Sequence, residues 1–429
     1  MAAQNTIGKR DDEATTKRSA LARPSCMRHV IDSSAFFHHD HYFGALVTSN
    51  LYLDLHVLQT VPPSNLNRDD AGTPKQAVYG GARRARVSSQ AWKRATRTAY
   101  AAAIPETDRA TRTKRIAMKL AEQLEQQEDL SPEDAARLAT GLLEPLGITM
   151  SQRKSTETSY LLFYGRRQVE AIANLVRGRA RELLALDDKG LKGELRRLDV
   201  DGELMRAHPA EVALFGRMVA DRAGLNVDAA VQVAHALSTH AVETEFDYYT
   251  AVDDENKREE TGAGMIGTVE FNSATLYRYA TCNLPQLHDN LGGGASTAES
   301  AAQAARRFTE AFTKSMPSGH QNSFAHRTLP FVVVTALRTD QPVNLVSAFE
   351  RPVFGSRGLA DESALALASE AQKVSEVWGS VPDKVFASYS PHADGTGEKL
   401  AQAFGKSLPF PQLTQHVQEA ALAGLRERE

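Results

Sequence analysis

The chain has 429 residues, a length that one or two hydrophobic cores can account for. Its net charge of −3 excludes a uniformly basic nucleic-acid coat, so any site for a polyanion must be local. Only two cysteines occur, Cys26 and Cys282, which excludes a disulfide framework and predicts a reducing, cytoplasmic location. No apolar run approaches the roughly 18 residues of a transmembrane helix, so the sequence predicts no membrane span.

Residues 1–46 differ from the rest because they are polar and show no hydrophobic period, which predicts a disordered extension. They also lack the apolar core of a secretory signal. The imidazole and carboxylate groups of His38–His41 suit divalent metals, but neighbouring residues on a disordered segment rarely enforce a coordination geometry. We therefore predict neither a metal site nor a cofactor.

Apolar and polar side chains alternate from Leu51 to Val57, which predicts a strand over residues 51–60. Its polar face would carry Tyr52, Asp54 and His56. A polar, turn-rich segment follows before the chain becomes basic.

The stretch from Lys75 to Arg97 contains seven Lys or Arg residues and no Asp or Glu, whereas a soluble surface normally mixes both signs. Ser88 or Ser89 can cap a helix over residues 89–103, and the start of that helix would attract a phosphate. A solvated basic helix face explains the charge run equally well. On composition alone, binding of an anionic polymer and an ordinary surface both stay open.

Two further features of this stretch favour a nucleic acid. Gly80 and Gly81 would let the backbone approach a ligand closely, because glycine has no side chain. Trp92 or Tyr79 would stack on a base.

The region from Thr107 to Leu237 reads as mainly helical. Ser131 and Pro132 form a helix-start signature, and apolar residues recur at helical spacing elsewhere. The helices predicted from this spacing are Leu161–Val176, Ala180–Leu186 and Val212–Ala220.

Two strands are predicted next, Glu243–Val252 and Val269–Asn283, with the acidic, glycine-ended segment Asp253–Gly267 between them. This segment formally contains a G-x-G-x-x-G spacing. A dinucleotide fingerprint must follow a strand and open a helix, whereas this one follows a charged loop and opens a strand. The segment therefore favours the tip of a projecting hairpin over a nucleotide site.

The remaining pattern predicts a helix over residues 297–314, a buried strand Leu329–Leu337 and a short helix Val343–Phe349. Together with the earlier elements this gives a β-α-β-β-α-β order with a helical insertion after the first helix. The predicted fold class is therefore α+β.

Several of these stretches are long and follow one another in a specific order: LDLHVLQTVPPSNLNRDD, KQAVYGGARRARVSSQAWKRATR, HALSTHAVETEFDYYTAVDD and EFNSATLYRYATCNLPQLHDNLGG. They resemble the CasC family, the backbone subunits of the type I-E Cascade CRISPR surveillance complex, from about Leu51 to Pro352. The resemblance implies a non-catalytic protein with a modified RRM-like palm, helical fingers and a projecting thumb, which coats a guide RNA in several copies.

The resemblance places the palm at 47–104 and 238–429, the fingers at 105–237 and the thumb hairpin at about 253–267. Members of the family normally begin just before the first strand, so residues 1–46 suggest an over-long start assignment with the natural start near Val47. Deleting residues 1–46 is then expected to leave RNA binding and assembly unchanged.

The resemblance also implies site residues and partners. The RNA-binding residues would be Arg68, Lys75, Ser88, Gln90, Lys93, Arg94, Arg97, Arg217 and Met218. The thumb residues would be Tyr249, Thr250 and Val252. The implied partners are the CRISPR guide RNA, target DNA through the guide, further copies of the chain head to tail, and the subunits CasA, CasB, CasD and CasE.

Two enzymatic alternatives remain, of which a nucleotide-cofactor enzyme is the weaker. An RRM-fold endoribonuclease would need a histidine as acid or base. The candidates are His56, His235, His240, His288, His320 and His326. No second catalytic group stands at a diagnostic spacing from any of them, and His56, on the polar face of the first strand, is the one to test. Asp69 and Asp70 resemble a handle for Mg²⁺ but fall where the family has a structural or RNA-facing loop.

Overall fold

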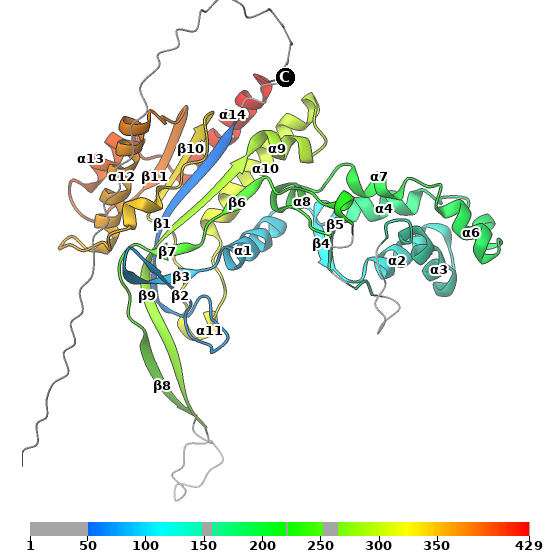
Figure 1. Cartoon of the computed structure of the whole chain (residues 1–429), viewed down its shortest axis with the longest axis horizontal. Helices are drawn as coiled ribbons and strands as arrows, with labels where there is room; N and C mark the ends of the chain where they lie inside the picture. Colours follow the sequence, from blue (N-terminus) through cyan, green and yellow to red (C-terminus); the bar gives the residue numbers. More distant parts are fainter. Residues whose placement is uncertain (1–49, 148–156, 160, 220–221, 252–264, 429) are drawn as a thin grey trace, which may run out of the picture. The chain divides into compact units, whose positions relative to one another are not determined.

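The computed structural model of the chain describes residues 50–147, 157–159, 161–219, 222–251 and 265–428 (Figure 1). The predicted extension 1–46, the predicted start near Val47 and thumb residue Val252 lie outside these residues.

An antiparallel sheet forms the centre of the fold. Among the described residues its order is β11-β10-β1-β9-β7-β3-β2, and β6 and β8 each pair with β9. The strands are β1 (Tyr52–Ser64), β2 (Gln76–Tyr79), β3 (Ala82–Val87), β6 (Val231–Val233), β7 (Ala236–Ser238), β8 (Glu245–Ala251), β9 (Met265–Asn283), β10 (Val332–Arg338) and β11 (Lys384–Tyr389). The long strand β9 pairs with β1 through its second half and with β8 through its first half.

Helices cover both faces of β1. Leu53, Leu55 and Val57 point into one core, and this core includes residues of α1, α9, α10 and α14. Successive side chains of a strand point to opposite faces, so Asp54 and His56 point the other way, and both are buried there. The predicted polar face of β1 is therefore not exposed, because η3, α12 and α13 pack over it.

The helices of this part include α1 (Ser89–Ala102), α9 (Leu284–Asn290), α10 (Ala295–Lys314), α11 (Gln321–Phe324), η3 (Leu345–Phe349), α12 (Leu359–Trp378), α13 (Thr396–Phe404) and α14 (Phe410–Arg426). The strand order β10-β1-β9-β7, with α1 after β1 and α10 after β9, is that of a β-α-β-β-α-β unit. The predicted α+β class is confirmed. The second strand of this unit is β7, however, and not the predicted strand Glu243–Val252, which pairs as β8 with the first half of β9.

The helical insertion has a hydrophobic core of its own, built mainly by leucine and alanine. Its elements are η1 (Glu106–Asp108), β4 (Ala110–Thr113), α2 (Ile116–Glu128), α3 (Pro132–Leu143), β5 (Leu162–Gly165), α4 (Arg166–Asn174), α5 (Ala180–Leu184), α6 (Asp188–Leu195), α7 (Val200–Met205), α8 (Ala210–Phe215) and η2 (Ala223–Leu225). Ser131 caps α3 by accepting a hydrogen bond from the Asp134 N–H, as its sequence signature predicts.

Two helix predictions in the insertion are wrong in part. Residues 162–165 pair with β4 as a strand, because all four are buried and two are aromatic, so the helix begins only at Arg166. The helix predicted to reach residue 220 ends at Phe215, because Gly216 takes a positive φ and Arg217 then pairs with Val227. The strands β6 and β7 belong to the central sheet. The second sheet-forming segment of the chain therefore begins before residue 238, where the second part of the palm was predicted to start.

The predicted hairpin is present as β8 and the first half of β9, paired from Glu245↔Phe271 to Ala251↔Met265. Its tip lies outside the described residues, together with Gly262 and Gly264. Gly267 lies in β9 opposite Tyr249, so the G-x-G-x-x-G spacing opens a strand and not a helix, as expected. A Cβ at Gly267 would overlap the Tyr249 ring, which gives this glycine a packing role.

No helix in the described part of the chain is both long enough and apolar enough to cross a membrane.

Candidate nucleic-acid interface

Helix α1 turns one face to the core and the opposite face outward. Trp92, Thr96 and Tyr100 recur at a spacing of four and are buried, which anchors the helix to the sheet. Gln90 and Arg94 are exposed, and Lys93 is half-exposed between the two faces. The basic side chains predicted for RNA binding are thus presented on the outer side of α1.

Trp92 does not face a ligand. It is fully buried, and the Arg278 guanidinium lies 3.7 Å from its ring centroid in a cation–π contact. The predicted base stacking by Trp92 is therefore wrong, because the helix period that points Arg94 outward points Trp92 inward. Tyr79 is half-exposed, and its hydroxyl donates to the Val346 carbonyl.

The backbone amides at the start of α1 are largely occupied by the protein. The Ser88 N–H donates to Asn67 Oδ1 (2.9 Å), the Ser89 N–H to His235 Nδ1 (3.1 Å) and the Ala91 N–H to Ser88 Oγ (3.2 Å). Ser88 itself is buried and acts as the N-cap. The expected phosphate site at the helix start is thus closed in the free protein, and Ser88 contributes as a cap.

The charged groups near this helix start are cations from neighbouring strands. The Lys75 carbonyl accepts from the Arg86 N–H at 2.9 Å, so Lys75 and Arg86 lie side by side at the edge of the sheet. Partial burial lowers the pKa of His235 below its usual value, and the positive charges of Arg86 and Lys75 lower it further. Because both residues act on the imidazole, the three groups form one basic cluster beside Ser89. Sequence reasoning missed Arg86 and His235 as parts of this site.

Not every arginine of the basic run belongs to this surface. Arg84 is fully buried, and its guanidinium donates to the backbone carbonyls of Tyr79, Ser238, Thr239, Phe349 and Glu350. A Cβ at Gly80 would overlap the Glu350 carbonyl oxygen. Gly80 is therefore needed for close approach of the protein backbone, and the prediction that it admits a ligand is wrong. A Cβ at Gly81 would meet no atom within 4 Å in the part of the chain that the structure describes.

Arg97 lies where α1 meets the insertion. Its guanidinium is 5.4 Å from the Phe163 ring centroid, and burial lowers its pKa, opposed by the carboxylate of Glu211. Arg94 and Arg112 also act on it electrostatically, so the basic surface continues from α1 to β4. Arg112 is exposed and was not predicted. Arg97 therefore links two elements of the protein in addition to its predicted contact with RNA.

Arg68 and His320 meet on two loops beside the hairpin. Arg68 Nη1 lies 3.1 Å from His320 Nε2, and because guanidinium only donates, this contact requires the neutral imidazole. The Phe324 ring packs against His320 and against Phe271 of β9. Arg68, predicted to bind RNA, is exposed on this loop. Asp69, considered as an Mg²⁺ ligand, accepts hydrogen bonds from the Ala71 N–H and from the N–H and hydroxyl of Thr73. Asp69 thus stabilises a turn and is not free as an Mg²⁺ handle.

Arg217 and Met218 point in opposite directions. Arg217 is only 4% exposed, and its Nε donates to the Leu225 carbonyl at 2.8 Å. Burial lowers the pKa of Arg217 to about 10. The predicted contact of the Arg217 side chain with RNA is therefore wrong, because the extended backbone after Gly216 turns it inward. Met218 is 82% exposed and available, so it is not a core filler.

The hairpin exposes large apolar side chains. Phe246 and Tyr248 of β8 and Ile266 of β9 are mostly exposed, and Tyr249 is exposed beside them. Thr250 is exposed as well. Such side chains on a two-stranded ribbon have no core to enter, which favours a role in contacting something other than this chain.

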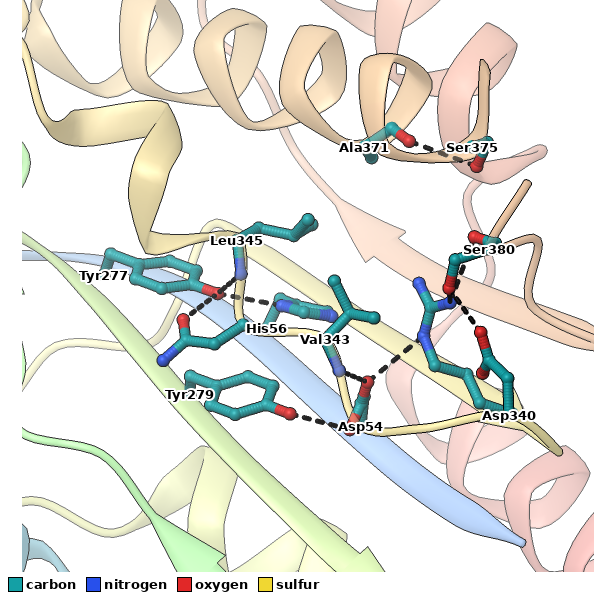
Figure 2. Close-up of polar contacts among 12 residues, drawn as sticks. Asp54, His56, Tyr277, Tyr279, Asp340, Val343, Leu345, Ala371, Ser375 and Ser380 are labelled. Carbon is teal, nitrogen blue, oxygen red and sulfur yellow. Dashed lines mark hydrogen bonds and ion pairs between the residues drawn. The ribbon is translucent and has the colours of Figure 1, made fainter. Parts of the chain in front are cut away.

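The residue favoured for ribonuclease chemistry, His56, is buried in a polar network (Figure 2). His56 Nδ1 lies 2.9 Å from the Tyr277 hydroxyl, and the ring is 2% exposed. Burial, assisted by the positive charge of Arg338, lowers the pKa of His56 to about 3. His56 is thus closed off from a polymeric substrate and is neutral at physiological pH.

Asp54 is the acidic member of the same network. Its carboxylate accepts from the Tyr279 hydroxyl and the Val343 N–H, both at 2.9 Å, and lies 3.2 Å from Arg338 Nε (Figure 2). Burial raises the pKa of Asp54, and these three contacts oppose that shift. The network is structural, because it ties β1 to β9, β10 and the loop before η3.

A family model described as "CT1975-like protein" matches residues 53–415. A solved chain described as "CRISPR RNA-guided surveillance complex, pre-nicking" is 32% identical, with a TM-score of 0.73, covering 86% of this chain and 100% of that one. A second, "CRISPR RNA-guided surveillance complex", is 29% identical, with a TM-score of 0.62, covering 86% of this chain and 99% of that one. No curated protein was found to match the chain.

Proposed function

The chain belongs to the CT1975-like protein family, and from this premise we propose that it is a CRISPR RNA-binding subunit of a Cascade-type surveillance complex in antiviral defence. The proposal goes further in assigning it to type I-E as a CasC-like backbone subunit. In this role the protein contributes binding and no catalysis, and copies of it lie head to tail along the guide RNA, a contact that can propagate. Its other partners are the remaining Cascade subunits and, through the guide, target DNA. The complex acts in the cytoplasm.

One observation carries the proposal: the outer face of α1 and the adjoining strand edge gather exposed and half-exposed cations. None of the ion pairs found in the described ranges involves Lys75, Lys93 or Arg94. A surface of this kind attracts the phosphates of any nucleic acid, independently of base sequence. This suits a subunit that must hold guides of many sequences, since selectivity is then left to guide–target base pairing.

Two solved chains of CRISPR RNA-guided surveillance complexes, each similar over 86% of this chain, support the assignment to a surveillance complex. The exposed apolar hairpin is a second feature that a solitary RNA-binding domain does not need. We assign it as the thumb, which reaches over the guide to a neighbouring copy.

The alternative function is an RRM-fold endoribonuclease that processes the guide precursor. The burial of His56 is evidence against an endoribonuclease, because His56 is the histidine favoured for that catalysis. Incubation of the pure protein with a CRISPR repeat RNA separates the two functions. We expect protection of the RNA from added nuclease, and cleavage by the protein alone would overturn the scaffold assignment.

A further inference from the structure

His235 is held in a defined protonation state by its contact with α1. It lies on the two-residue link between β6 and β7, its ring is exposed, and its Nδ1 is 3.1 Å from the Ser89 nitrogen. A backbone N–H only donates, so Nδ1 must carry the lone pair and the single ring proton must be on Nε2. In the free protein His235 is therefore a neutral acceptor.

The charges around His235 favour this neutral state. Arg86 of β3 and Lys75, which precedes β2, both act on the ring, and among the described residues no carboxylate is found to act on it. Partial burial and these two cations keep the pKa of His235 below the ordinary value of 6.5. The ring therefore stays uncharged near pH 7 as long as nothing negative approaches.

We propose that His235 is a phosphate ligand of the guide RNA and that it binds in its protonated form, so that RNA binding takes up a proton at this position. The inference rests on the proposed function. A phosphate beside Arg86 and Lys75 offsets the charges that keep the imidazole neutral, and it favours the imidazolium directly. One proton passes from a solvent hydronium to Nδ1, so an N–H bond forms as an O–H bond breaks, and no other covalent bond changes.

Protonation also changes the start of α1. With a proton on Nδ1, His235 no longer accepts from the Ser89 N–H, and both groups become donors. A phosphate oxygen is the acceptor that satisfies both of them. His235 thus occupies the Ser89 amide in the free protein and shares a phosphate with it in the complex.

Two other histidines near the interface differ from His235. Both nitrogens of His240 are occupied inside the protein, by the Ala241 carbonyl and the Thr275 N–H. His320 accepts from Arg68, but Asp69 and Asp70 follow Arg68 in the chain, so a charge change there has anionic neighbours. Because His320 also accepts a hydrogen bond near the interface, the test includes the variant His320→Gln.

The test measures the affinity of the full chain for a short unstructured RNA at about pH 6, 7 and 8 and constant salt. Uptake of one proton makes binding tighter by up to about tenfold per pH unit on lowering the pH. We expect this slope in the wild type, a flat profile with weaker binding at pH 6 for His235→Gln, and a flat profile with tight binding for His235→Lys.

His416→Gln is the control, because His416 is a half-exposed histidine on α14 that faces Glu419 and lies outside the interface. It should keep the wild-type slope. Titration calorimetry in buffers of different ionisation enthalpy counts the protons taken up and should give fewer for His235→Gln.

The outcomes separate this inference from the proposed function. A wild type that binds RNA with a salt dependence but no pH dependence overturns the role of His235 and leaves the function intact. Loss of the slope in His320→Gln with retention in His235→Gln assigns the proton elsewhere and also overturns it. Failure of the wild type to bind RNA at any of these pH values overturns both. If His235→Gln does not fold, His235→Lys decides, since a pH slope as steep as that of the wild type would contradict the proposal.

Discussion

Two regions of the molecule use basic residues in different ways. In the helical insertion, arginines face carboxylates on their own or neighbouring helices, as in Arg137–Asp188, Arg166–Glu106, Arg196–Glu144, Arg197–Glu194 and Arg222–Asp201. On the outer face of α1, no ion pair is found for Lys93 or Arg94 within the part of the chain that the structure describes. The insertion therefore compensates its charge internally, whereas the α1 face leaves positive charge for a ligand outside the chain.

The difference is already present in the order of residues along the chain. Acids alternate with arginines from Arg179 to Arg206, but none occurs from Lys75 to Arg97. Exposed ion pairs add only about 0–1 kcal/mol each, so stability does not explain either pattern. The segregation is explained by what each surface must do: the insertion must stay soluble, and the α1 face must attract a polyanion.

The largest effect is expected from a comparison of Arg83 with Arg84, which are neighbours in sequence and differ in environment. Arg84→Ala removes a buried guanidinium and leaves several backbone carbonyls without their donor. We expect the free energy of unfolding to fall by about 3–5 kcal/mol, measured by urea denaturation. Arg83 is exposed and donates to Gln76, so Arg83→Ala should change it by less than about 0.5 kcal/mol.

A loss for Arg84→Ala as small as that expected for Arg83→Ala would show that Arg84 is not structural. The separation of buried from exposed cations in this strand would then be wrong.

A second test concerns the buried histidine that supports the sheet. The pKa of His56 is about 3 in the folded chain, whereas its ordinary value, taken for the unfolded chain, is 6.5. As the pH falls, the unfolded chain therefore binds a proton at His56 before the folded chain does. The resulting stability is present above about pH 6.5 and is lost progressively down to about pH 3. At pH 5 the loss from His56 alone is about 2 kcal/mol relative to pH 7.

Urea denaturation at both pH values measures this loss, and His56→Gln should show a smaller one. Asp54 acts in the opposite direction, because burial raises the pKa of its carboxyl and stability is gained on its protonation. His416→Gln serves as the half-exposed control and should follow the wild type. An identical pH dependence for His56→Gln and the wild type would remove His56 as its cause.

The core of the fold could be predicted because its elements have strong periods. The alternation in β1, the capping serine of α1 and the β-branched run of β10 each specify one element locally. Residues 162–165 were misassigned as helix, because a short apolar run has no period of its own and its partner strand β4 decides the outcome. The burial of Asp54 and His56 was missed for a similar reason: the helices that cover them come about 300 residues later in the chain.

The site was predicted as a charge pattern, but not residue by residue. Lys93 and Arg94 are presented outward as the helix period requires, whereas Arg84 and Arg217 turn inward, where backbone carbonyls accept their hydrogen bonds. Sequence alone does not distinguish a buried arginine from an exposed one. His235 was considered only as a catalytic candidate, because its contact with Ser89 joins residues that are 146 positions apart.

A third test compares the two regions directly with matched charge changes. Lys93→Ala with Arg94→Ala and Arg196→Ala with Arg197→Ala each remove two positive charges. The first pair should weaken binding to unrelated RNAs about tenfold and flatten the log–log salt slope by roughly 0.7 for each lost phosphate contact. The second pair should leave the slope unchanged, since Arg196 and Arg197 face Glu144 and Glu194. We choose Arg94 over Arg97 because Arg97 also packs on Phe163.

If both double variants flatten the salt slope equally, RNA contacts the insertion as much as α1. The contrast between compensated and uncompensated charge would then have no functional meaning.

The smallest effect is expected at Met218, which follows a buried arginine and is itself 82% exposed. Met218→Ala removes no core contact, so the free energy of unfolding should change by less than about 0.5 kcal/mol. A flexible thioether on this surface can pack against the guide, and its loss should then raise the reactivity of a guide nucleotide toward a chemical probe without changing the salt slope. Arg217→Ala is the matched variant, because it should destabilise the protein through its lost hydrogen bonds and not through lost RNA contact. Probing of the guide in both variants checks this distinction. An unchanged pattern for Met218→Ala would leave Met218 as an ordinary exposed residue that does not contact the guide.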